Sequence, residues 1–387
     1  MWFFDSPHVV FGEDALSHLE QLTGRLAFIV TDGNLDKLGL LQLVQNRLKN
    51  AGIPTVVFEQ IEPEPSLQTV KLCAAQMLQH QPDWIIGLGG GSCLDAAKAA
   101  WLLYERPDVD PASINPFDQF GLRAKAKLIT IPTTSGTGSE ATWYVVLTDT
   151  EEHRKLGMGS RELLPDLTIV DPTLVMSLPP ALTADTGLDA LTHAIEGYCS
   201  TWHNDFSDGL CLQAAKLIFE YLPRAYQNGA DAEAREHLHN AATIAGLGFG
   251  NSQATLAHAM GHALGALFHV PHGRAVSLFL PYTIEFTANA GGSRYFEIAR
   301  MLGLSAADDR SGAVNLVAAL RDLQRTIHQS TSLRELGIDR EAYMLALDDL
   351  VAKAETDTQL VTSPRLPETA ELRRLFECAY DGASVDF

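Results

Sequence analysis

Several features that would place this chain in a membrane or outside the cell are missing from its sequence. The segment from Met1 to Pro7 has neither the basic start nor the apolar run of a signal peptide. No stretch approaches the roughly eighteen uninterrupted apolar residues that a transmembrane helix needs. Five cysteines are scattered without a CxxC pair, so we expect reduced thiols rather than disulfides. Together these absences predict a cytoplasmic protein that does not associate with a membrane.

Positive charge is also scarce. The chain has 28 lysines and arginines against 48 aspartates and glutamates, which gives a net charge of −20. Such an excess of negative charge disfavours nucleic acids and anionic membrane surfaces as partners. We therefore expect the chain to act on a small molecule.

The length and the order of apolar patterns predict two domains. A chain of 387 residues, 46% of them hydrophobic, exceeds the usual size of one core. Residues 1–178 alternate β-rich runs with helical stretches, which is typical of a Rossmann-like α/β domain with a mostly parallel sheet. The expected strands of this domain are 26–32, 55–59, 84–89, 127–132, 144–148 and 167–171.

Beyond the adjacent prolines Pro179 and Pro180 the pattern changes. Apolar residues recur mainly with a 3.6-residue period, so residues 179–387 are expected to form an all-α domain. The expected helices are 182–200, 208–227, 231–250, 257–267, 281–289, 293–302, 312–326, 340–353 and 369–380.

Two loops rich in small residues follow strands of the first domain. The first runs from Gly89 through Ser92 directly into a helix, where glycines let a phosphate approach free N–H groups. Ser92 stands where the dinucleotide fingerprint has its third glycine, so that fingerprint is not met; a tight turn without a ligand is the alternative. The second loop, from Pro132 to Glu140, offers hydroxyls and N–H groups to a phosphate or ribose, or is simply a polar turn.

An acidic residue ends the first strong strand. Asp32 can accept hydrogen bonds from both hydroxyls of an adenine ribose and would repel a 2′-phosphate. The alternative is a turn in which Asp32 accepts a backbone hydrogen bond before Gly33. Position alone favours neither interpretation.

Histidines are concentrated in the second domain. Asp189 and His193 lie four residues apart, which puts both side chains on one face of a helix. Four more histidines follow within fifteen residues: His258, His262, His269 and His272. A lone histidine is usually a core residue, but this number predicts a divalent metal held by Asp189, His193, His258 and one later histidine. Spacing does not decide which later histidine is the ligand. A spare imidazole beside a metal can hold a cofactor or relay a proton.

These motifs, in this order, resemble the iron-containing (group III) alcohol dehydrogenases over essentially the whole chain. The matching segments are Gly89-Gly-Gly-Ser92-x-x-Asp95-x-Ala-Lys98, Pro132-Thr-Thr-x-Gly-Thr-x-x-Glu140, Gly187-x-Asp189-Ala-Leu-Thr-His193-Ala-Ile-Glu196, His258-x-Met-x-His262 and Pro271-His272-Gly273. The resemblance implies the two-domain architecture that this family shares with dehydroquinate synthase.

The resemblance also implies roles for individual residues. The implied metal ligands are Asp189, His193, His258 and His272. His262 corresponds to an extra histidine near the nicotinamide and is the implied catalytic residue, while His269 is outside the pattern. The implied cofactor-binding residues are Asp32, Gly89, Gly90, Gly91, Ser92, Asp95, Thr133, Thr134 and Thr137. The implied substrate-pocket residues are Trp143, Tyr144 and Phe249.

The expected activity is reversible hydride transfer between a nicotinamide and a small primary alcohol or aldehyde. The ligand set suits Fe²⁺, although Zn²⁺ or Mn²⁺ would also bind it. Asp32 favours NAD(H), with NADP(H) left open. We expect a homo-oligomer, a homodimer by default.

Other functions share parts of this pattern. Arg274 leaves room for an acidic substrate, so a hydroxy-acid or glycerol-type polyol dehydrogenase is the nearest alternative. A cyclase resembling dehydroquinate synthase would need a dense basic cluster, which is not seen near the ligand motifs. A metallohydrolase would need no dinucleotide.

Overall fold

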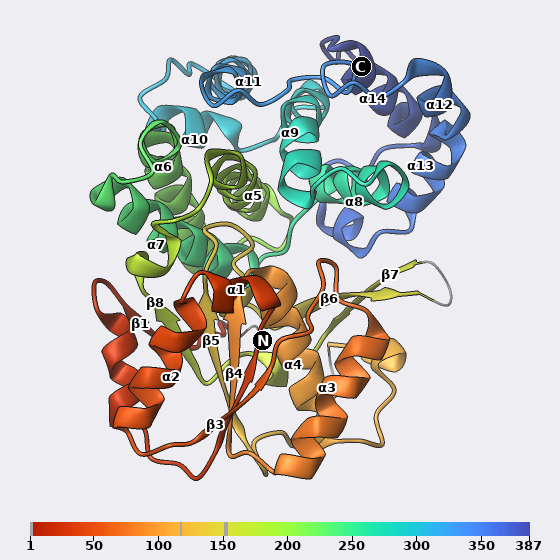
Figure 1. The fold of residues 1–387 in the computed structure, drawn as a ribbon. Helices are drawn as coiled ribbons and strands as arrows, with labels where there is room; N and C mark the ends of the chain where they lie inside the picture. Colours follow the sequence, from red (N-terminus) through yellow and green to blue (C-terminus); the bar gives the residue numbers. More distant parts are fainter. Residues whose placement is uncertain (1–2, 117, 151–153) are drawn as a thin grey trace. The chain divides into compact units, whose positions relative to one another are not determined.

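The computed structural model describes residues 3–116, 118–150 and 154–387. The chain divides into two compact units, Met1–Ser177 and Leu178–Phe387 (Figure 1). The α/β character expected of the first part and the helical character expected of the second are both confirmed.

The first unit is built on a six-stranded sheet with the strand order β1-β8-β5-β4-β2-β3. All of its ladders among the described residues are parallel. Its strands are β1 (His8–Phe11), β2 (Ala27–Val30), β3 (Thr55–Phe58), β4 (Trp84–Gly89), β5 (Lys127–Pro132) and β8 (Leu167–Val170). The edge strand β1 was not anticipated from the sequence.

Both faces of this sheet are covered by helices, which explains why its central strands are mostly apolar on both faces. On β2, Phe28 and Val30 pack with α3 and α4, whereas Ala27 and Ile29 face the opposite cluster with α2. Figure 1 shows α2 on one side of the sheet and α3 and α4 on the other. The helices are α1 (Gly33–Lys37), α2 (Leu40–Asn50), α3 (Leu67–His80) and α4 (Gly91–Glu105).

One expected strand lies outside the main sheet. The segment predicted at 144–148 forms β6 (Tyr144–Asp149), which pairs with β7 (Arg154–Gly159) as a separate antiparallel ribbon. Its apolar residues Val145 and Leu147 are buried with the α3 and α4 cluster rather than within the sheet. An apolar run predicts a strand, but it does not show which strand it pairs with.

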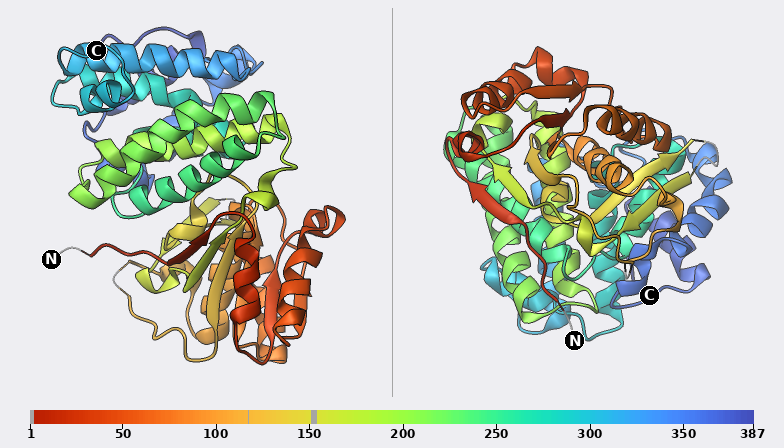
Figure 2. Two further views of the ribbon diagram at one scale, coloured as in Figure 1. Left: turned by 90° about the vertical axis from the view of Figure 1, so that its left-hand side faces the viewer. Right: turned by 90° about the horizontal axis from the view of Figure 1, so that it is seen from below.

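The second unit is helical in all of its regular structure that is described. Its helices are α5 (Pro180–Cys199), α6 (Asp205–Gln227), α7 (Ala232–Phe249), α8 (Leu256–Phe268), α9 (His272–Asn289), α10 (Tyr295–Met301), α11 (Asp309–Thr326), α12 (Arg340–Leu345), α13 (Leu347–Glu355) and α14 (Thr369–Asp381). Helix α5 packs against α6, α7 and α9, and Figure 2 shows α5, α6 and α7 side by side. Most of α5 is buried, so it forms the centre of this unit.

The expected helices 281–289 and 340–353 differ most from the structure, whereas the starts of α6 and α11 lie three residues before the expected ones. The helix expected to start at Pro281 begins nine residues earlier, at His272, and continues through the proline. A proline inside a helix costs one hydrogen bond and about 3 kcal/mol, but the residues around Pro281 are buried in the core and keep the helix intact. The helix expected at 340–353 is interrupted at Ala346, between α12 and α13.

A glycine sets the spacing of two helices that carry candidate ligands. A Cβ atom on Gly261 of α8 would lie 2.8 Å from the Cα and 2.9 Å from the backbone nitrogen of Val276 in α9. Backbone atoms cannot rotate away from such a contact, so α8 and α9 approach this closely only because residue 261 is glycine.

We therefore expect Gly261→Ala to lower the free energy of unfolding by about 1–3 kcal/mol through overpacking. The matched control is Gly209→Ala on the exposed side of α6, where a Cβ would meet no atom within 4 Å. That change should raise the free energy of unfolding by about 0.5–1 kcal/mol, because alanine favours a helix more than glycine does. Denaturant unfolding measures both, and equal effects of the two substitutions would contradict the close contact.

Candidate metal centre and cofactor loops

One face of the buried helix α5 carries Asp189, His193 and Glu196. The positions i, i+4 and i+7 lie above one another on a helix, and all three side chains are buried. The sequence spacing of Asp189 and His193 anticipated this shared face, whereas no role was assigned to Glu196.

Two further helices bring imidazoles to the same place. His258 lies in the first turn of α8, and His272 is the first residue of α9. A Cβ on Gly273 would lie 2.1 Å from the carbonyl oxygen of Asp185 and 3.0 Å from the Cβ of Asp189. Glycine at this position therefore lets the start of α9 touch α5 beside the carboxylate.

The four side chains expected to bind a metal lie together. Ligand atoms of Asp189, His193, His258 and His272 all lie within 4.8 Å of one another. The Oδ1 atom of Asp189 is 3.8 Å from Nδ1 of His193, 3.8 Å from Nε2 of His258 and 3.3 Å from Nε2 of His272. A tetrahedral site with metal–ligand bonds of about 2.1 Å has edges of about 3.4 Å, so the spacing fits a divalent cation.

Three polar atoms at the centre of this cluster have no hydrogen-bond partner among the described residues. Asp189 Oδ1, His193 Nδ1 and His258 Nε2 are buried and make no hydrogen bond within the described part of the chain. A buried polar atom without a partner costs about 1–3 kcal/mol. Three such atoms pointing at one another indicate a ligand that all of them can bind.

The protonation states favour the same ligand. Burial alone would raise the pKa of Asp189, but the surrounding imidazoles outweigh burial and lower that pKa well below its usual range. Burial also lowers the pKa of His193 well below its ordinary value. An ionised carboxylate and a neutral imidazole are the forms in which these residues bind metals.

The remaining histidines of the segment occupy different positions. The His262 ring lies beside the cluster, with ring centroids 5.3 Å from His272 and 5.8 Å from His258. Its Nδ1 atom is 2.7 Å from Oδ2 of Asp357, a residue 95 positions away that no sequence pattern indicated. His269 is exposed at the end of α8 with a φ of 54°, which agrees with its omission from the ligand set.

An aromatic side chain covers one ligand. The ring of Phe249 stacks on His193 with a centroid distance of 3.9 Å and an interplanar angle of 11°. Phe249 is therefore adjacent to the cluster. In the first unit, Trp143 and Tyr144 contact each other edge to face and pack over Gly159 of β7.

The basic residue beside the cluster is already neutralised. Arg274 donates from Nε and Nη2 to the two carboxylate oxygens of Asp185, at 3.0 and 2.9 Å. A bidentate ion pair of this kind uses one edge of the guanidinium and balances its charge with that of Asp185.

The two small-residue loops of the first unit contact each other where β4 and β5 end. The Thr133 nitrogen donates to the carbonyl of Gly89 at 3.0 Å. A Cβ on Gly91 would lie 2.8 Å from the side chain of Thr137, and one on Gly90 would lie 3.4 Å from Thr134. No side chain among the described residues caps α4 at Gly90, so the helix start remains available to an anion.

Two expected cofactor-binding residues of this region accept hydrogen bonds from backbone nitrogens of the first unit. Asp32 caps α1 by accepting from the nitrogen of Asn34 at 2.7 Å, which is the turn described as the alternative above. Its ribose role stays a prediction. The hydroxyl of Ser92 does not cap α4; it accepts from the nitrogen of Glu64 at 3.3 Å.

The expected cofactor residue Asp95 is used to hold the second loop in place. Its Oδ1 accepts from the Ser139 hydroxyl at 2.6 Å, and its Oδ2 accepts from the nitrogen of Val146 at 2.9 Å. Lys98, fully buried one turn later, donates to the carbonyl of Ser139 at 2.6 Å and to that of Tyr144 at 3.1 Å. Asp95 and Lys98 therefore fix the second loop to the helix that begins at the first loop.

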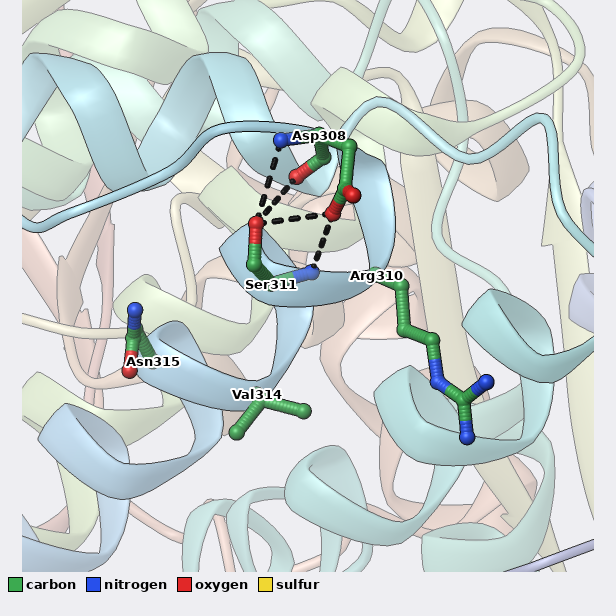
Figure 3. A pocket seen from close by; sticks show the side chains of 5 residues that line it. All are labelled: Asp308, Arg310, Ser311, Val314 and Asn315. Carbon is green, nitrogen blue, oxygen red and sulfur yellow. Dashed lines mark hydrogen bonds between the residues drawn. The ribbon is translucent and has the colours of Figure 1, made fainter.

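A surface pocket lies apart from these residues, at the start of α11 (Figure 3). Its polar groups are used in a capping box, in which Ser311 donates from its nitrogen to Asp308 at 2.7 Å. None of its lining residues belongs to the histidine cluster.

Among the described helices, none is long and apolar enough to cross a bilayer.

Comparisons with known proteins agree with the motifs in both units. Residues 6–172 match the family model described as iron-containing alcohol dehydrogenase, and residues 183–380 match the C-terminal model of the Fe-containing alcohol dehydrogenase family. An NADPH-dependent butanol dehydrogenase of Clostridium saccharobutylicum is 39% identical over 98% of both chains. A 1-propanol dehydrogenase, PduQ, of Citrobacter freundii is 36% identical over 95% of this chain and 96% of its own.

Longer relatives and solved structures also match. The chain spans 43% of the bifunctional aldehyde-alcohol dehydrogenase AdhE of Escherichia coli, to which it is 39% identical over 92% of its own length. A 1,3-propanediol oxidoreductase structure has a TM-score of 0.91 and 31% identity, covering 98% of this chain and 100% of that one. A sulfoacetaldehyde reductase of Bifidobacterium kashiwanohense in complex with NAD⁺ has a TM-score of 0.88 and 29% identity, with 98% of each chain covered. By its sequence motifs, its fold and these relatives, the chain belongs to the iron-containing alcohol dehydrogenase family and is an NAD(P)-linked oxidoreductase.

Proposed function

We propose that this enzyme interconverts a short primary alcohol and its aldehyde, with a divalent metal held by Asp189, His193, His258 and His272. The observation that carries the proposal is the group of four ligand side chains gathered from three helices. Three of them, Asp189, His193 and His258, place buried atoms there that have no hydrogen-bond partner among the described residues. A cation bound there would supply Lewis-acid polarisation of the alcohol or carbonyl oxygen. Fe²⁺ is the proposed metal, and Zn²⁺ or Mn²⁺ would fit the same donors.

The protein's own groups prepare this site for substrate. His272 is 42% exposed, whereas Asp189 is 2% exposed, so the cluster is reached from the His272 side. We propose that His262, beside His272 and paired with Asp357, holds or passes the proton that accompanies hydride transfer.

We propose that the first unit, Met1–Ser177, is the dinucleotide-binding domain expected at 1–178, and that the second, Leu178–Phe387, is the metal-binding domain expected at 179–387. The start of α4 would hold the pyrophosphate at Gly89, Gly90, Gly91 and Ser92, and the second loop would bind through Thr133, Thr134 and Thr137. Asp95 contributes by holding that second loop. The carboxylate of Asp32 favours NAD(H), although the butanol dehydrogenase relative is NADPH-dependent.

The proposed substrate is a small uncharged alcohol or aldehyde. The relatives named above include butanol and 1-propanol dehydrogenases, and we propose that Trp143, Tyr144 and Phe249 are substrate-contacting residues. Because Arg274 is paired with Asp185, a hydroxy acid is disfavoured. We also propose a cytoplasmic homodimer, in keeping with the acidic charge of −20 and the free cysteines.

Removing one exposed ligand tests the metal site. His272→Ala should leave the folded protein with metal binding at least about tenfold weaker and turnover of butanal with NADH at least about 100-fold lower, because one of four donors is lost. His269→Asn is the control, since asparagine tolerates the left-handed backbone at that position; it should keep both. Metal analysis with NADH absorbance measures the two variants, and a fully active, metal-free His272→Ala would refute the ligand set.

The cofactor proposal depends on the charge of Asp32. Asp32→Ser keeps a side-chain oxygen that can cap α1 but removes the charge. We expect the ratio of kcat/KM for NADPH to that for NADH to rise about tenfold, equivalent to losing about 1.4 kcal/mol of repulsion with the 2′-phosphate. An unchanged ratio would mean that Asp32 acts only as a helix cap.

The substitution His262→Ala distinguishes a role in proton transfer from a role as a metal ligand. His262→Ala should retain the metal content of the unmodified protein while kcat falls about 100-fold, because a general acid–base group is removed. Metal analysis and steady-state kinetics on the same preparation test this expectation. Loss of the metal together with activity would show that His262 is a ligand.

A further inference from the structure

Two histidines on α8 each have a carboxylate on Nδ1, buried in the case of Glu196 and partly buried in the case of Asp357. For His258 the partner is Oε2 of Glu196, in a close contact; for His262 it is Oδ2 of Asp357, at 2.7 Å. Each carboxylate uses its other oxygen to accept from the backbone. Oε1 of Glu196 accepts from the nitrogen of Ala257 at 2.6 Å, and Oδ1 of Asp357 accepts from that of Gln359 at 2.8 Å.

Glu196, unlike Asp357, connects the helix that carries two candidate ligands to the start of α8. It lies on α5, on the face that carries Asp189 and His193. Besides Ala257, its Oε1 accepts from the hydroxyl of Thr255 at 2.7 Å. Thr255 is the N-cap residue of α8 but does not cap it with its own side chain. Glu196 therefore satisfies an N–H group in the first turn of α8 and attaches that turn to α5.

We propose that Glu196 is a positioning residue of the metal centre, whose carboxylate holds the His258 ring so that Nε2 faces the other ligands. The inference rests on the metal site proposed above. An imidazole has two nitrogens, and a partner on Nδ1 decides that Nε2 is the one presented to a metal. Consistent with this, Nε2 of His258 lies 3.8 Å from Asp189 Oδ1 and has no hydrogen-bond partner among the described residues.

An amide cannot replace this carboxylate. The side chain of Glu196→Gln would have one acceptor oxygen, whereas the present contacts require acceptance from His258 and also from Thr255 and Ala257. In one orientation its NH₂ group faces the donors of Thr255 and Ala257. In the other it faces Nδ1 of His258, which then has to accept and leaves the ring proton on Nε2, the nitrogen presented to a metal. The volume and the burial are nearly unchanged, so the substitution tests hydrogen bonding rather than packing.

The experiment measures metal affinity directly. Apo-protein, prepared with a chelator, is titrated with Co²⁺ and followed by the visible absorption of the bound ion. We expect Glu196→Gln to weaken binding about 10–100-fold and to change the spectrum, because the His258 donor is displaced. The matched control is Asp357→Asn, the same chemical change on the neighbouring histidine of α8. It should bind Co²⁺ within about twofold of the unmodified protein.

The outcomes separate the possible roles of Glu196. A lower melting temperature of the apo-protein with unchanged Co²⁺ affinity and spectrum would make Glu196 a purely structural residue and overturn the inference. Equal losses of affinity in the Glu196 and Asp357 variants would also overturn it. If the unmodified protein failed to bind Co²⁺, the proposed metal site itself would be wrong.

Thr255→Val provides a second test in a chain that retains the buried carboxylate. It removes one of the hydrogen bonds that hold Oε1 and should weaken Co²⁺ binding about threefold. This result would support the inference even where Glu196→Gln folded poorly. Unchanged affinity and spectrum in the valine variant would contradict it.

Discussion

The arrangement of candidate ligands in the second unit depends on one buried charge, the carboxylate of Asp189. Asp189 is buried on the central helix with three imidazoles around it, and its Oδ1 has no hydrogen-bond partner within the described chain. Burying a charge is costly unless the charge is paired. A bound cation would pair it and would satisfy the imidazole nitrogens as well, so a cation would be stabilised where α5, α8 and α9 converge. The carboxylates of Glu196 and Asp357 lie on Nδ1 of His258 and His262, beside this cluster.

In the first unit, the loops that follow β4 and β5 hold backbone N–H groups in a fixed arrangement. Two strands of a parallel sheet end side by side, and the loops that follow them touch through small residues. Asp95 and Lys98 then fasten the second loop to α4. Because Lys98 is wholly buried, its pKa falls to about 8, and the nearby carboxylates of Asp95 and Glu140 limit this decrease. These residues therefore hold the second loop against the start of α4.

Much of this arrangement could be predicted from local patterns. The four-residue spacing of Asp189 and His193 fixes a shared helix face, and alternation of apolar runs predicts a parallel sheet. Choosing His272 over His262 as a ligand could not follow from spacing, because His262 shares a helix face with His258 at the same separation. The choice depends on where α9 starts and on the contact of Gly273 with α5. Asp357 reaches His262 from 95 residues away, and Pro281 continues a helix only because tertiary burial outweighs its local preference.

The central claim is that one metal ion in the Asp189 cluster is required for the redox reaction. The most direct measurement is an anaerobic titration of apo-protein with Fe²⁺, with the rate of NADH oxidation by butanal recorded at each addition. We expect negligible activity without metal and a linear rise that ends at one equivalent per chain. Full activity in protein shown by metal analysis to be empty would contradict it.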